Sequence, residues 1–425
     1  MGHLDALAAA CITPAMTDSP PPGAQAVRLL AIPAFRHFLL ARALSAIAFQ
    51  GSAVAIGWLI YDKTRNPFDL GLVGLFQFLP MLLLTLPAGH LADQIDRRRI
   101  GLVALSLEAL ALGVVAFGVW QGAAPVWAIF AAVFVIGAMQ AFERPALTSL
   151  LPSIVPPAQL QSAVATATSV GQTAMIIGPA AGGLLYGVGP VVPFLVSAVL
   201  FALAGVNVAL VRFAAKPQSR SPATLETVFA GVRFIASRPI ILGAISLDLF
   251  AVLLGGATAM LPVYARDILL AGPEALGFLR MAPAVGAVGM ALFLGRFPLR
   301  RDVGLKMLTA VAVFGLATIV FAYSTNIVLS IAMLATLGAA DALSVIVRSS
   351  LVQLLTPDEM RGRVNAVNQL FIGTSNQLGE FRAGTMGGLI GPVAAVAIGG
   401  IGTLAVVAIW AKQFPALRRV NTLAG

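Results

Sequence analysis

Apolar stretches of roughly 20 residues recur along almost the whole chain, and each is long enough to cross a bilayer as a helix. They lie at residues 37–60, 70–91, 99–121, 124–147, 160–187, 191–213, 239–264, 274–295, 303–323, 326–348, 364–389 and 391–413. The chain is 59% hydrophobic and 10% charged, whereas a water-soluble domain carries about a quarter charged residues. The sequence therefore predicts an all-α membrane protein with twelve transmembrane helices.

Several chemistries are excluded by the same composition. Cys11 is the only cysteine, and the three histidines are His3, His37 and His90, so neither a disulfide nor a metal site is expected. The chain contains no Gly-x-x-x-x-Gly-Lys-Ser/Thr sequence, no His-Glu-x-x-His sequence and no Ser/His/Asp set, so we expect no ATP site and no enzyme. We expect no cofactor, with the proton gradient as the energy source.

The net charge of +10 comes from basic residues whose positions along the chain predict its orientation in the membrane. If both termini are cytoplasmic, the basic residues of the cytoplasmic side include Arg36, Arg97, Arg98, Arg99, Arg212, Arg238, Arg300, Arg301, Lys306, Arg361, Arg363, Lys412 and Arg419. The opposite side receives little more than Lys63, Arg65 and Arg266. Because basic loops stay in the cytoplasm, this asymmetry predicts the orientation, and nucleic-acid binding is the weaker interpretation.

The longest polar interval lies halfway along the chain and divides the spans into two groups of six. The predicted organisation is a cytoplasmic tail (1–34), a six-helix bundle (35–213), a linker with an amphipathic helix (214–238), a second six-helix bundle (239–413) and a tail (414–425). Gly189-Pro190 in the first half matches Gly391-Pro392 in the second, and Tyr61 matches Tyr264. Repeated halves predict two pseudo-symmetric bundles around a cavity, as in alternating-access transporters; convergent loop composition is the alternative.

A charged loop follows the second span and reads Gly89-His-Leu-Ala-Asp93-Gln-Ile-Asp96-Arg97-Arg98-Arg99. It resembles the cytoplasmic loop signature of the major facilitator superfamily, with Gly89, Asp93, Arg97 and Arg98 at matching positions. Asp96 replaces a glycine of that signature, so we expect its side chain to hold the turn by a hydrogen bond. The resemblance implies a cytoplasmic gate; an ordinary solvated loop is the alternative.

A second match lies in the fifth span, where the sequence reads Gly178-Pro179-Ala-Ala-Gly182-Gly183. It is similar to the motif of the antiporter branch of the superfamily. The proline bends the helix and the glycines permit close packing against the other half, which would close the outer side.

The most specific resemblance is to the enterobactin-exporter type within the superfamily. This resemblance rests on Arg144-Pro145-Ala146, the stretch from Asp248 to Asp267, and the stretch from Arg361 to Phe381. Members of this group export siderophores or drugs. The resemblance therefore implies the fold of this chain more firmly than its substrate.

Charged side chains within the predicted spans are the candidates for mechanism, because a charge in the bilayer is costly unless it faces a cavity or a partner. They are Arg42, Glu108, Glu143, Arg144, Asp248, Arg280, Asp341, Glu380 and Arg382. The resemblance implies that the first, fourth, seventh and tenth spans line the cavity. Asp248, Asp341 and Glu380 are the proton-coupling candidates; for Asp248, a permanent ion pair with Arg42 or another basic residue is the alternative.

The other buried charges receive different roles. Glu108 is expected to pair locally, whereas Glu143 and Arg144 are assigned to the cytoplasmic gate, with Arg348 or Asp93 as partners and a substrate site as the alternative. Arg280 is expected either to receive an anionic substrate or to pair with Glu380. Candidates for the substrate cavity are Arg42, Gln50, Phe250, Arg280, Asn368 and Asn376.

The predicted function is secondary active transport, as a proton-coupled exporter of an amphiphilic small molecule, siderophore or drug. The protein would be a monomer in a bacterial inner membrane, with a small organic substrate, the lipid bilayer as its surroundings and no nucleic-acid partner. A lipid or lysophospholipid translocator and a non-transporting membrane sensor are the alternatives.

Overall fold

The computed structural model describes residues 29–212 and 225–422, and all regular elements in these two ranges are helices. Most of the predicted N-terminal tail, the first part of the predicted linker and residues 423–425 lie outside the described residues. Side chains are also left undescribed at a few positions within α3 and α8, including Gly89 and Asp93.

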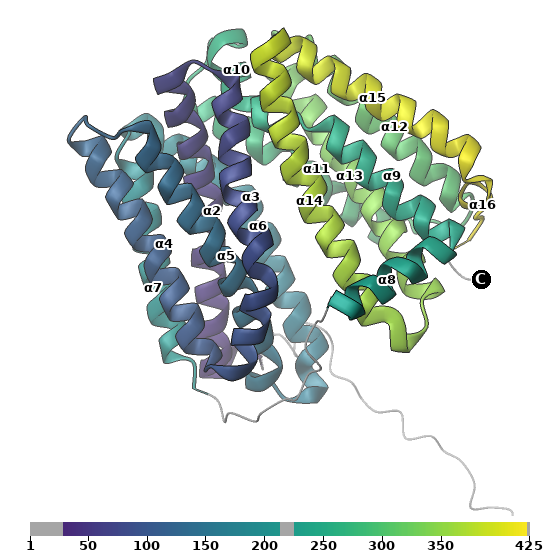
Figure 1. The fold of residues 1–425 in the computed structure, drawn as a ribbon, viewed down its shortest axis with the longest axis horizontal. Coiled ribbons are helices and arrows are strands. Elements are labelled where there is room, and N and C mark those ends of the chain that lie inside the picture. Colours follow the sequence, from purple (N-terminus) through teal and green to yellow (C-terminus); the bar gives the residue numbers. More distant parts are fainter. Residues whose placement is uncertain (1–28, 213–224, 423–425) are drawn as a thin grey trace, which may run out of the picture.

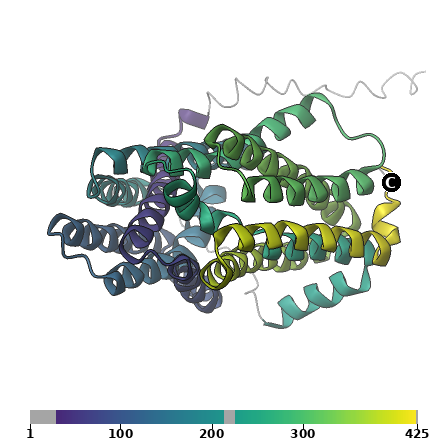
Figure 2. The same cartoon turned by 90° about the horizontal axis from the view of Figure 1, so that it is seen from above.

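Two groups of helices lie side by side, the first purple to blue and the second green to yellow (Figures 1 and 2). The first contains α2 (Pro33–Thr64), α3 (Pro67–Gln94), α4 (Arg97–Trp120), α5 (Val126–Ile154), η1 (Pro157–Gln159), α6 (Leu160–Val188) and α7 (Val192–Leu210). The second contains α9 (Pro239–Gly255), η2 (Thr258–Met260), α10 (Leu261–Val263), η3 (Tyr264–Ile268), α11 (Pro273–Arg296), α12 (Val303–Ala322), α13 (Ile327–Leu355), α14 (Asp358–Ile390), α15 (Pro392–Gln413) and α16 (Pro415–Arg418). The short amphipathic helix α8 (Leu225–Ser237) precedes the second group and packs on α14 and α9.

Ten helical segments of the described chain are long and apolar enough to cross a membrane. The two other long helices, α6 and α14, coincide with predicted spans at 160–187 and 364–389 but carry more polar residues. Both lie at the contact between the bundles, since α6 packs on α11 and α14 packs on α3. Polar side chains are tolerated in such helices because they face a partner or a cavity rather than lipid.

The span predicted as one helix over 239–264 is broken, which is a correction to the sequence analysis. Helix α9 ends at Gly255, and the chain continues through η2, α10 and a π-helical turn, η3. At the break, a Cβ on Gly256 would lie 2.7 Å from the carbonyl oxygen of Gly379 in α14. Backbone-to-backbone approach at this point is possible because Gly256 has no side chain.

The two bundles touch at the end that carries η3 and diverge toward the end that carries α8 (Figure 1). We call these the η3 end and the α8 end. Glycines form the contact near the η3 end: a Cβ on Gly71 of α3 would lie 3.0 Å from Cα of Gly384 in α14. Likewise, a Cβ on Gly183 of α6 would lie 2.9 Å from Cα of Gly277 in α11. Among the described residues, these close approaches bring the bundles together at the η3 end.

Candidate functional site

Three adjacent cavities occupy the region where the bundles face one another. A cavity of about 600 Å³ is formed by α2, α5 and α6, and one of about 300 Å³ is formed mainly by helices of the second bundle. Met175 lines both of them. A smaller space of about 50 Å³ between the bundles shares Phe49 with the first cavity and Thr258 with the second. Shared walls make these spaces a candidate path for a substrate.

A polar cluster forms part of the wall of the first cavity. The Ser45 hydroxyl donates a hydrogen bond to Oε1 of Glu143 at 2.5 Å. The Gln140 amide nitrogen donates to Oε2 of Glu143 at 2.5 Å and to Oε1 of Glu108 at 2.8 Å. The Gln140 carbonyl oxygen accepts from Nε of Arg144 at 2.9 Å. A single amide therefore connects two buried carboxylates of α4 and α5 to a guanidinium at the cavity.

This arrangement differs from the partners expected for these residues. Glu143 is 3% exposed and lies inside the first bundle, and the expected partner Arg348 pairs elsewhere. Glu108 is fully buried, and its Oε2 has no hydrogen-bond partner among the described residues. The sequence placed both glutamates on the correct helices but could not show that Gln140 joins them.

A second charged cluster lies in the second bundle. Asp248 of α9 and Arg348 of α13 form an ion pair and are 5% and 2% exposed. Asp341, about two turns before Arg348 in α13, lines a small pocket together with Asp248. The same Asp341 also lines the cavity of about 300 Å³. Asp341 thus stands between a buried ion pair and the space shared by the bundles.

The alternative prediction for Asp248, an ion pair with Arg42 or another basic residue, agrees with the structure, and the basic partner is Arg348. Arg42 belongs to the other bundle, where its Nε donates to the carbonyl oxygen of Ala167 at 3.1 Å. Arg348 was counted among the candidate gate partners, so its position in the bundle core corrects that interpretation.

Glu380 and Arg280 both line the small space between the bundles. The Thr258 hydroxyl donates to Oε1 of Glu380 at 3.3 Å, and Nη1 of Arg280 donates to the carbonyl oxygen of Ala53 at 3.2 Å. Arg280 therefore reaches from α11 to the backbone of α2. The described ion pairs do not include one between Arg280 and Glu380.

The remaining cavity candidates divide into two groups. Gln50 lines the cavity of about 600 Å³, and Asn376 lines the one of about 300 Å³. Asn368 is buried outside these cavities, and its Oδ1 has no partner among the described residues. Phe250 is a correction: its ring packs on Trp410 at 5.3 Å between centroids and is 39% exposed. Phe250 lies two positions after Asp248, and that spacing rotates a side chain by about 200° to the other side of a helix.

The segment predicted as a charged loop is mostly helical: Gly89 and Asp93 lie in the last two turns of α3, Arg97 begins α4, and only Ile95 and Asp96 lie between the two helices. The surroundings of Gly89 and Asp93 lie outside the described set. Asp96 accepts a hydrogen bond from the backbone nitrogen of Arg98 at 2.9 Å and so caps α4, which confirms the expected replacement for glycine. Arg97 donates to the carbonyl oxygen of Ser149, and Arg98 donates to that of Val211. The hydrogen-bonded guanidinium of Arg98 also holds the pKa of Asp96 below its ordinary value.

The glycine motif of α6 contacts both bundles. Within the first bundle, a Cβ on Gly178 would meet Gln50 and one on Gly182 would meet the backbone of Gly51. Gly183, and the carbonyl oxygen of Pro179, face Gly277 in α11. The motif therefore forms part of the contact between the bundles near the η3 end.

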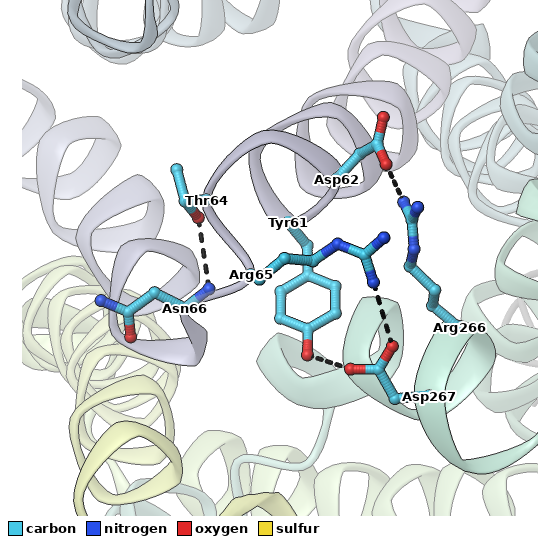
Figure 3. Close-up of polar contacts among 7 residues, drawn as sticks. All are labelled: Tyr61, Asp62, Thr64, Arg65, Asn66, Arg266 and Asp267. Atoms are coloured by element: carbon cyan, nitrogen blue, oxygen red, sulfur yellow. Dashed lines mark hydrogen bonds and ion pairs between the residues drawn. The ribbon is translucent and has the colours of Figure 1, made fainter.

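A polar network at the η3 end was not predicted. Figure 3 shows Tyr61 and Arg65 of α2 directed at Asp267, and Asp62 directed at Arg266. The Tyr61 hydroxyl donates to Asp267, Arg65 lies 3.5 Å from Asp267, and Arg266 forms an ion pair with Asp62. We call these five residues the η3 latch. Its signal in the sequence is a pair of charged segments following matched tyrosines, Tyr61 and Tyr264.

A family model described as transmembrane secretion effector matches residues 25–423. The chain belongs to this family. Transmembrane secretion effectors are transporters of the major facilitator superfamily, so the chain is a multi-pass membrane transporter and not an enzyme.

Two curated relatives of this transmembrane secretion effector are exporters. It is 27% identical over 404 residues to the enterobactin exporter EntS of Shigella boydii, covering 91% of this chain and 93% of that protein. It is 29% identical over 411 residues to the multidrug efflux pump Tap of Mycobacterium bovis, covering 92% and 95%.

Solved structures agree on the fold. A bacterial homologue of the human lysosomal transporter Spinster superposes with a TM-score of 0.69 at 14% identity, covering 94% of this chain and 97% of that one. The transporter PepTSo gives 0.70 at 12% identity, covering 91% and 98%. These likenesses show that the chain has the fold of major facilitator transporters.

Proposed function

We propose that this transporter couples the export of amphiphilic small organic molecules to proton entry by alternating access. The cavities between the bundles supply a binding space of the size that holds drug-like molecules, about 300–1,000 Å³. The relatives named above export a siderophore and drugs, which supports the same class of substrate.

The position of Asp341 carries the proposal. Its cluster contains two carboxylates, Asp248 and Asp341, but one guanidinium, Arg348. With both carboxylates ionised the cluster has one excess negative charge, which is costly in a membrane-embedded core. A proton on Asp341 removes that excess, and Asp341 also borders the open cavity through which the proton can exchange. Asp248 then acts mainly as the fixed partner of Arg348, while Glu380 is a further candidate within the space between the bundles.

The orientation follows from the distribution of basic residues. The α8 end carries those of the loops after α3, α7, α11, α13 and α15, whereas the η3 end carries Lys63, Arg65 and Arg266. By the positive-inside rule the α8 end faces the cytoplasm and the η3 latch faces outward. The protein then acts as a monomer in a bacterial inner membrane, with the cavity reached from the cytoplasm.

Uptake by inverted vesicles tests the coupling, with ethidium and enterobactin as the two probes. Acidifying the vesicle interior should drive uptake in the wild type, and Asp341→Asn should abolish the dependence on the gradient. Asp302→Asn, a change in a surface loop, is the matched control. Equal uptake with and without a gradient would contradict proton coupling, and an unchanged gradient dependence in Asp341→Asn would remove that residue from the mechanism.

A lipid translocator would need a lateral opening between α3 and α14 or between α6 and α11. Both seams are closed near the η3 end by the glycine contacts described above. A non-transporting sensor would take up neither probe in the same assay.

A further inference from the structure

Two arginines face the cavity of about 600 Å³ from the first bundle. Arg42 of α2 is half-buried and Arg144 of α5 is exposed. Their described partners are uncharged: Arg42 donates to a backbone carbonyl oxygen, and Arg144 donates to Gln140 and lies over the ring of Phe49 at 5.8 Å. The described ion pairs include neither arginine.

The carboxylate that lines the cavity beside these arginines, Glu143, already accepts hydrogen bonds from other side chains. Both oxygens of Glu143 accept hydrogen bonds, from Ser45 and from Gln140, and the side chain is only 3% exposed where it contributes to the wall of the cavity. Glu143 attracts Arg42, and Arg144 repels it less strongly, so one carboxylate stands against two guanidinium groups at this cavity. Two like charges that share one cavity repel each other, and an anion placed between them would relieve that repulsion.

The rest of the cavity is lined by apolar and uncharged polar side chains, which suit the body of an amphiphilic molecule. Ala46, Phe49, Leu147 and Met175 give it apolar walls, and Gln50, Gln172 and Thr168 add hydrogen-bonding groups. We propose that Arg42 and Arg144 bind the acid group of an amphiphilic organic anion, whose apolar body lies along Phe49, Leu147 and Met175. Guanidinium groups suit this role because their planar array of donors matches a carboxylate or phosphate.

This inference rests on the proposed function in taking the cavity as the substrate site, but it concerns binding and needs no gradient. A failure of proton coupling and a failure of anion recognition are therefore distinguishable. The probes are pyrenebutyrate and its neutral amide, which differ by one charge. Their binding to the purified protein in phosphatidylcholine nanodiscs is followed by energy transfer from tryptophan to pyrene.

We expect the wild type to bind the acid about tenfold more tightly than the amide, with a preference that shrinks as salt is added. Arg42→Gln and Arg144→Gln should each bring the ratio toward one while leaving amide binding unchanged, which also shows that the variants are folded. Arg296→Gln, an exposed arginine at the α8 end outside the cavity, is the matched control.

Equal binding of acid and amide by the wild type would overturn the proposal. So would an undiminished preference in both cavity variants, which is the result expected if these arginines serve only as a gate. A preference that disappears when phosphatidylglycerol replaces part of the phosphatidylcholine would assign the arginines to a lipid phosphate and would overturn the assignment to substrate.

Discussion

Asp62 at the end of α2 and Arg266 in η3 form an ion pair that joins the two bundles. Their side chains are 41% and 24% exposed, so the pair contributes at most about 1 kcal/mol. That is too little to hold the fold together but enough to bias an equilibrium between two arrangements of the bundles. The η3 latch is thus suited to setting how often the outward side opens.

Reversing one charge of the latch should increase the population that is open at the η3 end. For Asp62→Arg or Arg266→Asp we expect a change of up to about fivefold, since 1 kcal/mol corresponds to about that factor. Spin labels at Trp120 and Val328, which are 71% exposed in the first and second bundles, would report the separation. The double exchange should restore the wild-type distribution, and Asp358→Arg at the α8 end is the control. Equal distributions in all variants would contradict a latch.

The glycine contact between α6 and α11 gives a steric prediction. A Cβ on Gly277 would lie 2.7 Å from the carbonyl oxygen of Pro179, so Gly277→Ala must push the helices apart. We expect transport to fall, and a cysteine introduced in place of Val328 at the η3 end to react faster with a membrane-impermeant maleimide. Gly289→Ala in the same helix is the control, because its Cβ meets nothing within 4 Å. If both variants transport equally, close packing at this seam is not required.

Breaking the buried pair of Asp248 and Arg348 should destabilise the protein itself. Asp248→Ala removes the ion-pair partner of Arg348, a defect of up to about 3–5 kcal/mol in comparable buried pairs, and the nearby Asp341 carboxylate offsets part of it. The double variant Asp248→Ala/Arg348→Met removes both charges and should recover most of the lost stability. The unfolding midpoint in detergent, followed by tryptophan fluorescence, measures this. A double variant less stable than Asp248→Ala would show that Arg348 has another partner that stabilises it.

The parts of this structure set by local physics could be predicted from the sequence. The spans follow from hydrocarbon thickness, and the cap at Asp96 follows from turn chemistry, because each depends on neighbouring residues. The pairing of Asp248 with Arg348 joins residues 100 positions apart, so it depends on how α9 and α13 pack. The break after Gly255 depends in the same way on the approach of α14.

The capping residue Asp96 provides a prediction about pH. Because its pKa is held low by Arg98, its ionised form stabilises the folded state above the ordinary aspartate pKa of about 4. That contribution is lost as the pH falls through the lowered pKa. Asp96→Asn keeps an oxygen that can cap α4 but cannot ionise, so the wild type should unfold at a higher temperature at pH 7. The gap between the two midpoints should shrink once the pH falls below the ordinary aspartate pKa and close below the lowered pKa of Asp96, since other carboxylates titrate equally in both proteins. A gap that persists in acid would mean that Asp96 stabilises the loop through its shape and hydrogen bonding and not through its charge.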